Sequence, residues 1–167
     1  VAVFSIYLTL LDYLEPPGIE TFKFPNLING NFFNADFFDQ TSVYNTELKN
    51  IEFDFIIGNP PWMRGKGEKE KPLYVQYIEE RRKKENHING PQIEIGNKEL
   101  AQGFLLRSSD FANNKTRIAL IVTSKVVYNL QSLAFRKYFL NYFNIERIFE
   151  LAAVRREVFD KSNDKAI

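Results

Sequence analysis

The chain has 167 residues, enough for one ordinary domain, and its 44% hydrophobic and 26% charged residues are typical of a globular protein. It has no cysteine and a single histidine, so disulfides, thiolate metal sites and a histidine-based zinc site are not expected. A net charge of +1 does not indicate strong electrostatic binding of nucleic acid. No apolar run could span a membrane, and the first residues lack the basic start and cleavage site of a signal peptide. We therefore expect a cytoplasmic protein without a membrane partner.

Helices and strands alternate along the first part of the chain. Residues 1–15 are predicted to form an amphipathic helix that ends at the sequence PPG. Residues 24–33, FPNLINGNFF, are predicted to form a short strand, and residues 41–50 a loop or short helix. The run FDFIIG, residues 53–58, has the apolar and β-branched composition of a strand buried on both faces of a parallel sheet.

The second part of the chain continues the same alternation after a charged insert at residues 63–99. Within this insert, residues 73–84 are predicted to form a helix. A helix, a strand, a helix and a strand are then predicted over residues 100–112, 117–123, 132–143 and 145–151. The third of these elements is expected to turn Leu133, Phe139, Leu140 and Phe143 toward the sheet. The alternation predicts an α/β fold with a parallel or mostly parallel sheet.

A rigid polar turn, Asn59-Pro60-Pro61-Trp62, follows the strand FDFIIG directly. Ligands of open α/β sheets bind beyond the carboxyl ends of the strands, so this turn is where a reacting group would be held. The two prolines have no N–H, and the turn therefore offers acceptors and few donors. The side-chain oxygen of Asn59 and the carbonyl of Pro60 can accept from one amine, and Trp62 can lie over a flat group. The turn predicts a pocket for a planar amine, and a strand terminator with a packed tryptophan is the alternative.

The motif resembles the (Asp/Asn/Ser)-Pro-Pro-(Tyr/Phe/Trp) motif of S-adenosylmethionine-dependent amino-methyltransferases, above all the DNA adenine methyltransferases of restriction-modification systems, including type IIG-like enzymes that also cut DNA. The order of the later segments is similar as well: a helix carrying Phe104, the strand RIALIVT, the segment FRKYFL, the strand IERIFEL and a final Val158-Phe159. This resemblance implies methyl transfer from S-adenosylmethionine to the N6 amine of adenine. It also implies double-stranded DNA as the partner, through a longer parent protein.

The resemblance assigns catalytic roles to five positions of this chain. Asn59 and the Pro60 carbonyl would accept both hydrogens of the adenine amine, with Pro61 completing the turn. Trp62 would stack on the flipped adenine, and Phe159 would sandwich it from the other side.

Two residue pairs compete for the adenine ring of the cofactor. Asn31-Phe32 follows a predicted strand, whereas Asp36-Phe37 matches the Ala-Asp-Phe sequence that the family carries. Neither pair is preferred on the sequence, and the resemblance implies no metal.

Two parts of the usual cofactor site do not occur in this sequence. Family members carry a strand with a glycine-rich turn for the methionine part of the cofactor, and then an acidic residue for the ribose. The resemblance therefore implies a partial class I (Rossmann-like) methyltransferase sheet, mostly parallel, that lacks the first two strands and the last. We expect residues 1–167 to form one partial catalytic domain, an internal fragment of a longer enzyme. Such a fragment would be inactive alone and prone to self-association through its sheet edges.

Two other interpretations remain open. Release-factor glutamine methyltransferases and some ribosomal RNA guanine methyltransferases share Asn-Pro-Pro-(Tyr/Phe), which would keep the chemistry and change the substrate. A degenerate methyltransferase fold, retained as a non-catalytic interaction domain, is the alternative of a different class.

Overall fold

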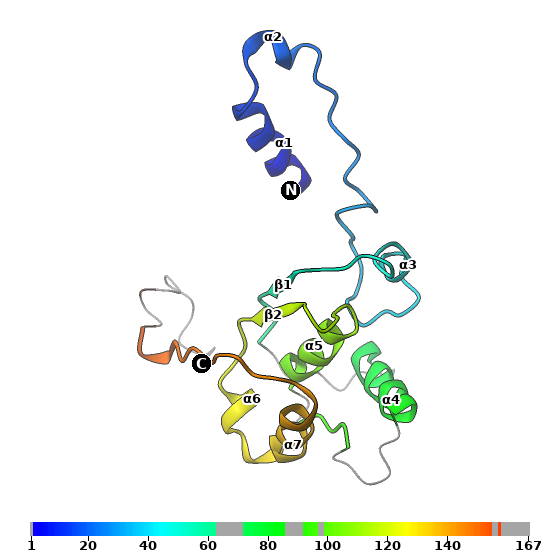
Figure 1. Cartoon of the computed structure of the whole chain (residues 1–167), viewed down its shortest axis with the longest axis vertical. Helices are drawn as coiled ribbons and strands as arrows, with labels where there is room; N and C mark the ends of the chain where they lie inside the picture. The colour runs from blue at the N-terminus through cyan, green and yellow to red at the C-terminus, as the bar shows by residue number, and fades with distance from the viewer. Residues whose placement is uncertain (1, 63–71, 86–91, 97–98, 155–156, 158–167) are drawn as a thin grey trace. The chain divides into compact units, whose positions relative to one another are not determined.

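The structure is a computed structural model that describes residues 2–62, 72–85, 92–96, 99–154 and 157 (Figure 1). It divides into two compact units. The first unit comprises Val1–Asp36 and Thr41–Ile51, and the second comprises Phe37–Gln40 and Glu52–Ile167. None of the helices in the described ranges is both long and apolar enough to cross a membrane.

The first unit contains the helices α1 (Ala2–Asp12), α2 (Pro16–Ile19) and α3 (Tyr44–Glu47). The predicted first helix is thereby confirmed, and the polar segment 41–50 contains a short helix. The strand predicted at residues 24–33 is wrong, because this segment makes only an isolated bridge between Ile28 and Phe32. Its backbone folds back at Asn29, which has a left-handed φ of 59°, so the sequence NGN makes a turn and not an extended run.

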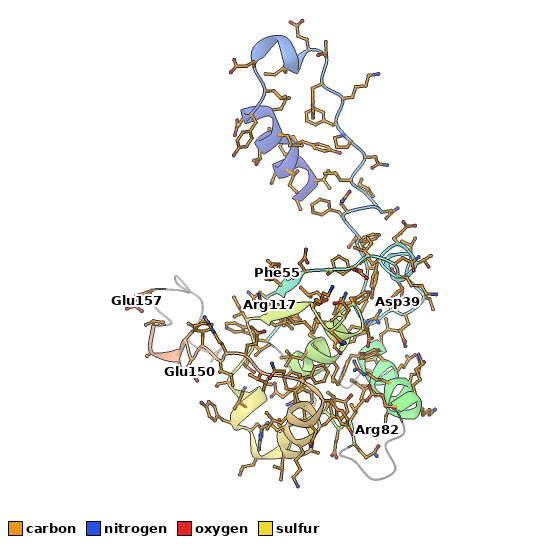
Figure 2. All side chains as sticks on the ribbon, viewed as in Figure 1. Asp39, Phe55, Arg82, Arg117, Glu150 and Glu157 are labelled. Carbon is orange, nitrogen blue, oxygen red and sulfur yellow. The ribbon has the colours of Figure 1, made fainter. Side chains whose placement is uncertain are left out.

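The second unit contains a two-stranded sheet of β1 (Phe55–Gly58) and β2 (Arg117–Leu120). The strands are parallel, and their register pairs Phe55 with Arg117 and Gly58 with Leu120 (Figures 1 and 2). The strands predicted at FDFIIG and RIALIVT and the predicted parallel arrangement are therefore confirmed for this two-stranded sheet. The strand predicted at residues 145–151 is wrong, because this described segment joins no sheet. Glu146 instead lies 3.4 Å from the Arg117 guanidinium, which is an ion pair and not a ladder contact.

Burial of β1 differs from the prediction of a strand covered on both faces. Phe55 and Ile57 are 64% and 77% exposed, whereas Ile56 between them is partly buried. Because successive side chains of a strand point to opposite faces, only one face of β1 meets the rest of this unit.

Helices supply the core of the second unit. They are α4 (Leu73–Glu85), α5 (Leu100–Ser109), α6 (Lys125–Tyr128) and α7 (Leu133–Tyr142), with 3₁₀ turns η2 (Leu130–Ser132) and η3 (Ala152–Val154). The predicted helices at 73–84, 100–112 and 132–143 are therefore confirmed with shifted ends. Buried apolar and aromatic side chains of these helices form one cluster with Phe38 and Ile93, which lie outside the helices. The helical members are Tyr74, Tyr77, Ile78, Ala101, Leu106, Val126, Phe135 and Tyr138.

The inward face of α7 (Leu133–Tyr142) agrees with the prediction only in part: Phe139, and Phe143 just beyond the helix, pack against the core cluster, but the two leucines do not. Leu133 and Leu140 are exposed, whereas Phe135 and Tyr138 are almost completely buried. The buried pair is three residues apart, which places both rings on one side of the helix. Phe139 and Phe143 pack against the same cluster from its edge.

Candidate active site

The site predicted at residues 59–62 begins where both strands end. The N–H of Ile121 donates to the carbonyl of Gly58 over 3.0 Å, which extends the ladder one step beyond β2. A Cβ atom on Gly58 would lie 3.2 Å from Cδ2 of Leu120, so the absent side chain lets the two chains approach closely here. The backbone of residues 59–62 forms neither a hydrogen-bonded turn nor a bend, so the turn predicted there is not observed. This Asn-Pro-Pro-Trp segment, still called the turn below, starts from a fixed point at the carboxyl edge of the sheet.

The far end of the turn is fixed by a second contact. The indole N–H of Trp62 donates to the carbonyl of Ile121 over 3.1 Å. Ile121 thus accepts from Trp62 and donates to Gly58. The two contacts join both ends of the turn to the end of β2. The Trp62 ring is thereby restricted in its orientation, and it is only partly buried.

Between these two contacts, exposure differs from residue to residue. Asn59 and Pro61 are exposed, and Pro60 is buried. The turn thus presents an amide side chain to solvent beside a partly open aromatic ring. Because neither proline carries an N–H, the backbone offers more acceptors than donors to this surface. The arrangement can accept hydrogens from a flat amine, which is the chemistry expected from the sequence.

Thr123 is a polar residue at the same edge that the sequence argument did not single out. It lies two residues beyond Ile121, and its hydroxyl oxygen is buried without a hydrogen-bond partner in the described part of the chain. A buried hydroxyl without a partner costs about 1–3 kcal/mol, so such groups are uncommon. The only signal in the sequence is a hydroxyl residue directly after an apolar strand, which is too common to identify a site.

Phe37, from the second candidate cofactor pair, lies in an aromatic cluster on α5. Its ring stacks on Phe104, with centroids 5.3 Å apart and planes 9° apart, and it lies 6.0 Å from the ring of Phe111. Arg107 Nε donates to the Phe37 carbonyl over 3.0 Å. Ring and backbone of Phe37 are therefore both held by one helix and the turn that follows it.

Arg107 is buried among aromatic rings, and its guanidinium has both hydrogen-bond and aromatic partners. Its Nη1 donates to the Asp110 carboxylate over 2.8 Å, and its guanidinium carbon lies 4.8 Å from the Phe111 ring centroid and 5.4 Å from that of Tyr77. Planar guanidinium groups bind carboxylates and stack on aromatic faces, and both contacts occur here. Sequence reasoning missed this residue, because a lone arginine in an amphipathic helix ordinarily faces solvent.

The remaining predicted residues lie elsewhere. Asn31, Phe32 and Asp36 belong to the first unit, whereas the catalytic turn belongs to the second. Asn31 and Asp36 are exposed, and Phe32 is partly buried. Phe159 lies outside the described residues.

The donor set fits one end of S-adenosylmethionine. An exposed carboxylate at Asp36 is an acceptor suited to the amine of an adenine ring, and the next residue, Phe37, is an aromatic held in place by Arg107. No group of three or more Asp, Glu or His residues that could hold a metal ion occurs in the described ranges.

Comparison with known protein families gives one result that covers almost the whole chain. Residues 1–159 match the Eco57I restriction-modification methylase family. Comparisons with curated proteins and with solved structures give no match. The match includes the Asn-Pro-Pro-Trp turn, both strands and the Asp36-Phe37 pair. The chain therefore belongs to the Eco57I restriction-modification methylase family.

Proposed function

We propose that this chain, as part of a DNA methyltransferase of a restriction-modification system, methylates the exocyclic N6 amine of adenine. The observation that carries the proposal is the Asn-Pro-Pro-Trp turn, fixed at both ends on the carboxyl edge of a parallel sheet, with Asn59 exposed. S-adenosylmethionine is the proposed cofactor, and it supplies a methyl group activated by a sulfonium.

The residues of the turn would act on the amine. The lone pair of an adenine amine is delocalised into the ring, which makes the amine a poor nucleophile. The Asn59 side-chain oxygen and the Pro60 carbonyl would accept its two hydrogens and favour a tetrahedral nitrogen. The same two acceptors would stabilise the positive charge that develops on nitrogen during methyl transfer. No general base is required before the transfer.

The target base must leave the duplex to reach such a turn. Stacking on an aromatic side chain is worth about 1–3 kcal/mol per base, which would offset part of the unstacking cost. Trp62 is the proposed stacking residue, and its hydrogen bond to Ile121 restricts its ring before the base arrives. Phe159 is proposed for the opposite face of the base.

For the adenine of the cofactor, the structure supports Asp36-Phe37 over Asn31-Phe32. Asn31 would follow a strand only if residues 24–33 formed one. They form a turn and a single bridge. The Phe37 backbone is anchored by the buried Arg107. We further propose that residues 1–167 act as a partial domain that needs the rest of its enzyme for turnover.

Methyl transfer to duplex DNA tests this function directly. Labelled S-adenosylmethionine is incubated with DNA and either this chain or the complete product of its gene, and the methylated base is identified by mass spectrometry. We expect N6-methyladenine from the complete product and none from the chain alone. Loss of one acceptor from a preorganised site costs about 100- to 1,000-fold in rate, and we expect Asn59→Ala to lose activity on this scale. Asn114→Ala, at an exposed turn of the same unit, is the matched control and should retain full activity.

Other products would change the conclusion. Methylation of a glutamine-containing peptide or of ribosomal RNA, without methylation of DNA, would favour the related amino-methyltransferases that share the motif. Equal activity of Asn59→Ala and Asn114→Ala would remove the turn from catalysis. Absence of methyl transfer and of cofactor binding in the complete product would favour a non-catalytic interaction domain.

A further inference from the structure

We propose that Arg107 is a positioning residue that sets cofactor affinity by holding the segment that begins at Phe37. This inference rests on the proposed function, in which Asp36-Phe37 contacts the adenine of S-adenosylmethionine. Arg107 lies on α5 and touches neither the reacting amine nor the cofactor in this proposal. It acts through the Phe37 carbonyl, which accepts from Arg107 Nε over 3.0 Å.

The burial of Arg107 makes this contact specific. The residue is 5% exposed, and a buried charge is tolerated only when it is paired and hydrogen-bonded. Nε donates to the Phe37 backbone and Nη1 to the Asp110 carboxylate, so the two arms of the guanidinium join the segment to the end of α5. A lysine has a single ammonium on a flexible stem and cannot reproduce this fork.

Two further contacts direct the same segment onto α5. The Phe37 ring stacks on Phe104, and the Phe38 ring lies against Gly103, where a Cβ atom would be 3.2 Å from Phe38 Cζ. Gly103 and Phe104 therefore lie in one turn of α5 and Arg107 in the next, on the side of the helix that receives the segment. Because Asp36 is bonded directly to Phe37, the backbone that carries its carboxylate starts from a point that Arg107 fixes.

Arg81 offers a matched control on α4. It is also mostly buried, and it shares Asp110 with Arg107, its Nη1 lying 3.0 Å from the Asp110 carboxylate. Its other hydrogen bonds include the Tyr77 hydroxyl and the Glu85 carboxylate, and not the backbone of residues 37–40. Replacing Arg81 also removes a buried guanidinium, but the hydrogen bond from Arg107 to the Phe37 carbonyl stays in place.

The test compares Arg107→Met, Arg107→Lys and Arg81→Met in the complete gene product. Amide hydrogen exchange of residues 37–40 reports the segment, calorimetry reports S-adenosylmethionine affinity, and thermal unfolding reports stability. We expect faster exchange at residues 37–40 and about tenfold weaker cofactor binding in Arg107→Met, the loss that one charge-assisted hydrogen bond can produce. Arg107→Lys should give exchange rates and a cofactor affinity between those of wild type and Arg107→Met. Because it keeps the positive charge, it is the variant to measure if Arg107→Met does not fold. Arg81→Met should lower thermal stability and leave both other readouts within about twofold of wild type.

Each other result overturns the inference. Unchanged exchange at residues 37–40 in both Arg107 variants would show that Arg107 does not hold the segment. Equal loss of affinity in Arg107→Met and Arg81→Met would show a general effect of stability. Failure of the wild-type product to bind S-adenosylmethionine would overturn the proposed function itself, a result distinct from normal wild-type binding that the Arg107 variants leave unchanged.

Discussion

The helical side of the second unit and the strand edge that carries the Asn-Pro-Pro-Trp turn are built in opposite ways. On the helical side, Phe135, Tyr138 and Leu106 are almost inaccessible to solvent. At the strand edge, Asn59 is exposed, and Phe55 and Ile57 on β1 are largely exposed as well. Stability is therefore concentrated in one region and the proposed chemistry in the other.

The difference follows from what each region must do. In the proposed function the turn receives a flipped base and must be reachable from solvent, so it cannot be packed as the core is. It is instead held by two hydrogen bonds, from Ile121 N–H to Gly58 and from Trp62 to Ile121. Few contacts thus restrict the turn while leaving Asn59 open, and substitutions in the two regions should separate stability from activity.

Phe135→Ala should have the largest effect on stability. Truncation of a fully buried aromatic ring removes apolar contacts and leaves a cavity, and it typically costs about 3–5 kcal/mol. Chemical denaturation measures the change. Ile57→Ala on the exposed face of β1 is the matched control, and it should change the free energy of unfolding by less than about 0.5 kcal/mol. A large loss from Ile57→Ala would mean that this face of the strand is covered in solution.

Alkaline pH should destabilise the helical side next. Burial raises the pKa of both Tyr77 and Tyr138 above the ordinary value of 10.0, and neighbouring carboxylates, Asp110 for Tyr77 and Glu85 for Tyr138, raise it further. A folded-state pKa above the unfolded one means that the stabilisation is complete below about pH 10 and is lost as the pH rises beyond it.

We therefore expect the melting temperature to fall between pH 9 and pH 11, by at least the 2–4 °C that accompanies about 1 kcal/mol in a domain of this size. Tyr77→Phe should make this decline shallower, because one of the two groups no longer ionises. An identical pH profile for Tyr77→Phe and the wild type would exclude Tyr77 as a source of the decline.

The sequence predicted most of the helices of the second unit and the parallel pairing of its two strands. These elements have strong local signals: helical periodicity in the segments around α4, α5 and α7, and short β-branched runs for β1 and β2. The segments 24–33 and 145–151 carry similar apolar runs without forming strands. A strand requires a partner edge as well as a suitable composition, and composition alone does not report the partner.

The position of the Asn-Pro-Pro-Trp segment at the end of a strand was also predictable, because this sequence is a rare and rigid local pattern that follows a β-branched run. The contacts that hold this segment in place could not be predicted. The bond from Trp62 to the Ile121 carbonyl joins residues 59 positions apart, and Arg107 reaches the Phe37 carbonyl across 70 positions. Long-range contacts of a side chain to a backbone carbonyl leave no pattern in the sequence, because every residue offers the same acceptor.

The smallest effect that separates the two regions should come from Trp62→Phe. Phenylalanine keeps an aromatic face for the base but removes the N–H that donates to Ile121. An intramolecular hydrogen bond of this kind contributes about 0.5–1.5 kcal/mol, so unfolding should change by no more than about 1 kcal/mol. Methyl-transfer kcat/KM should fall about fivefold, because a freer ring must be ordered when the base stacks.

Trp62→Ala, which also removes the stacking face, should lose a further 1–3 kcal/mol of base binding, about 5- to 150-fold. If both variants lost activity equally, the hydrogen bond and not the ring would be the contribution of Trp62, and the stacking role would have to be assigned to another residue.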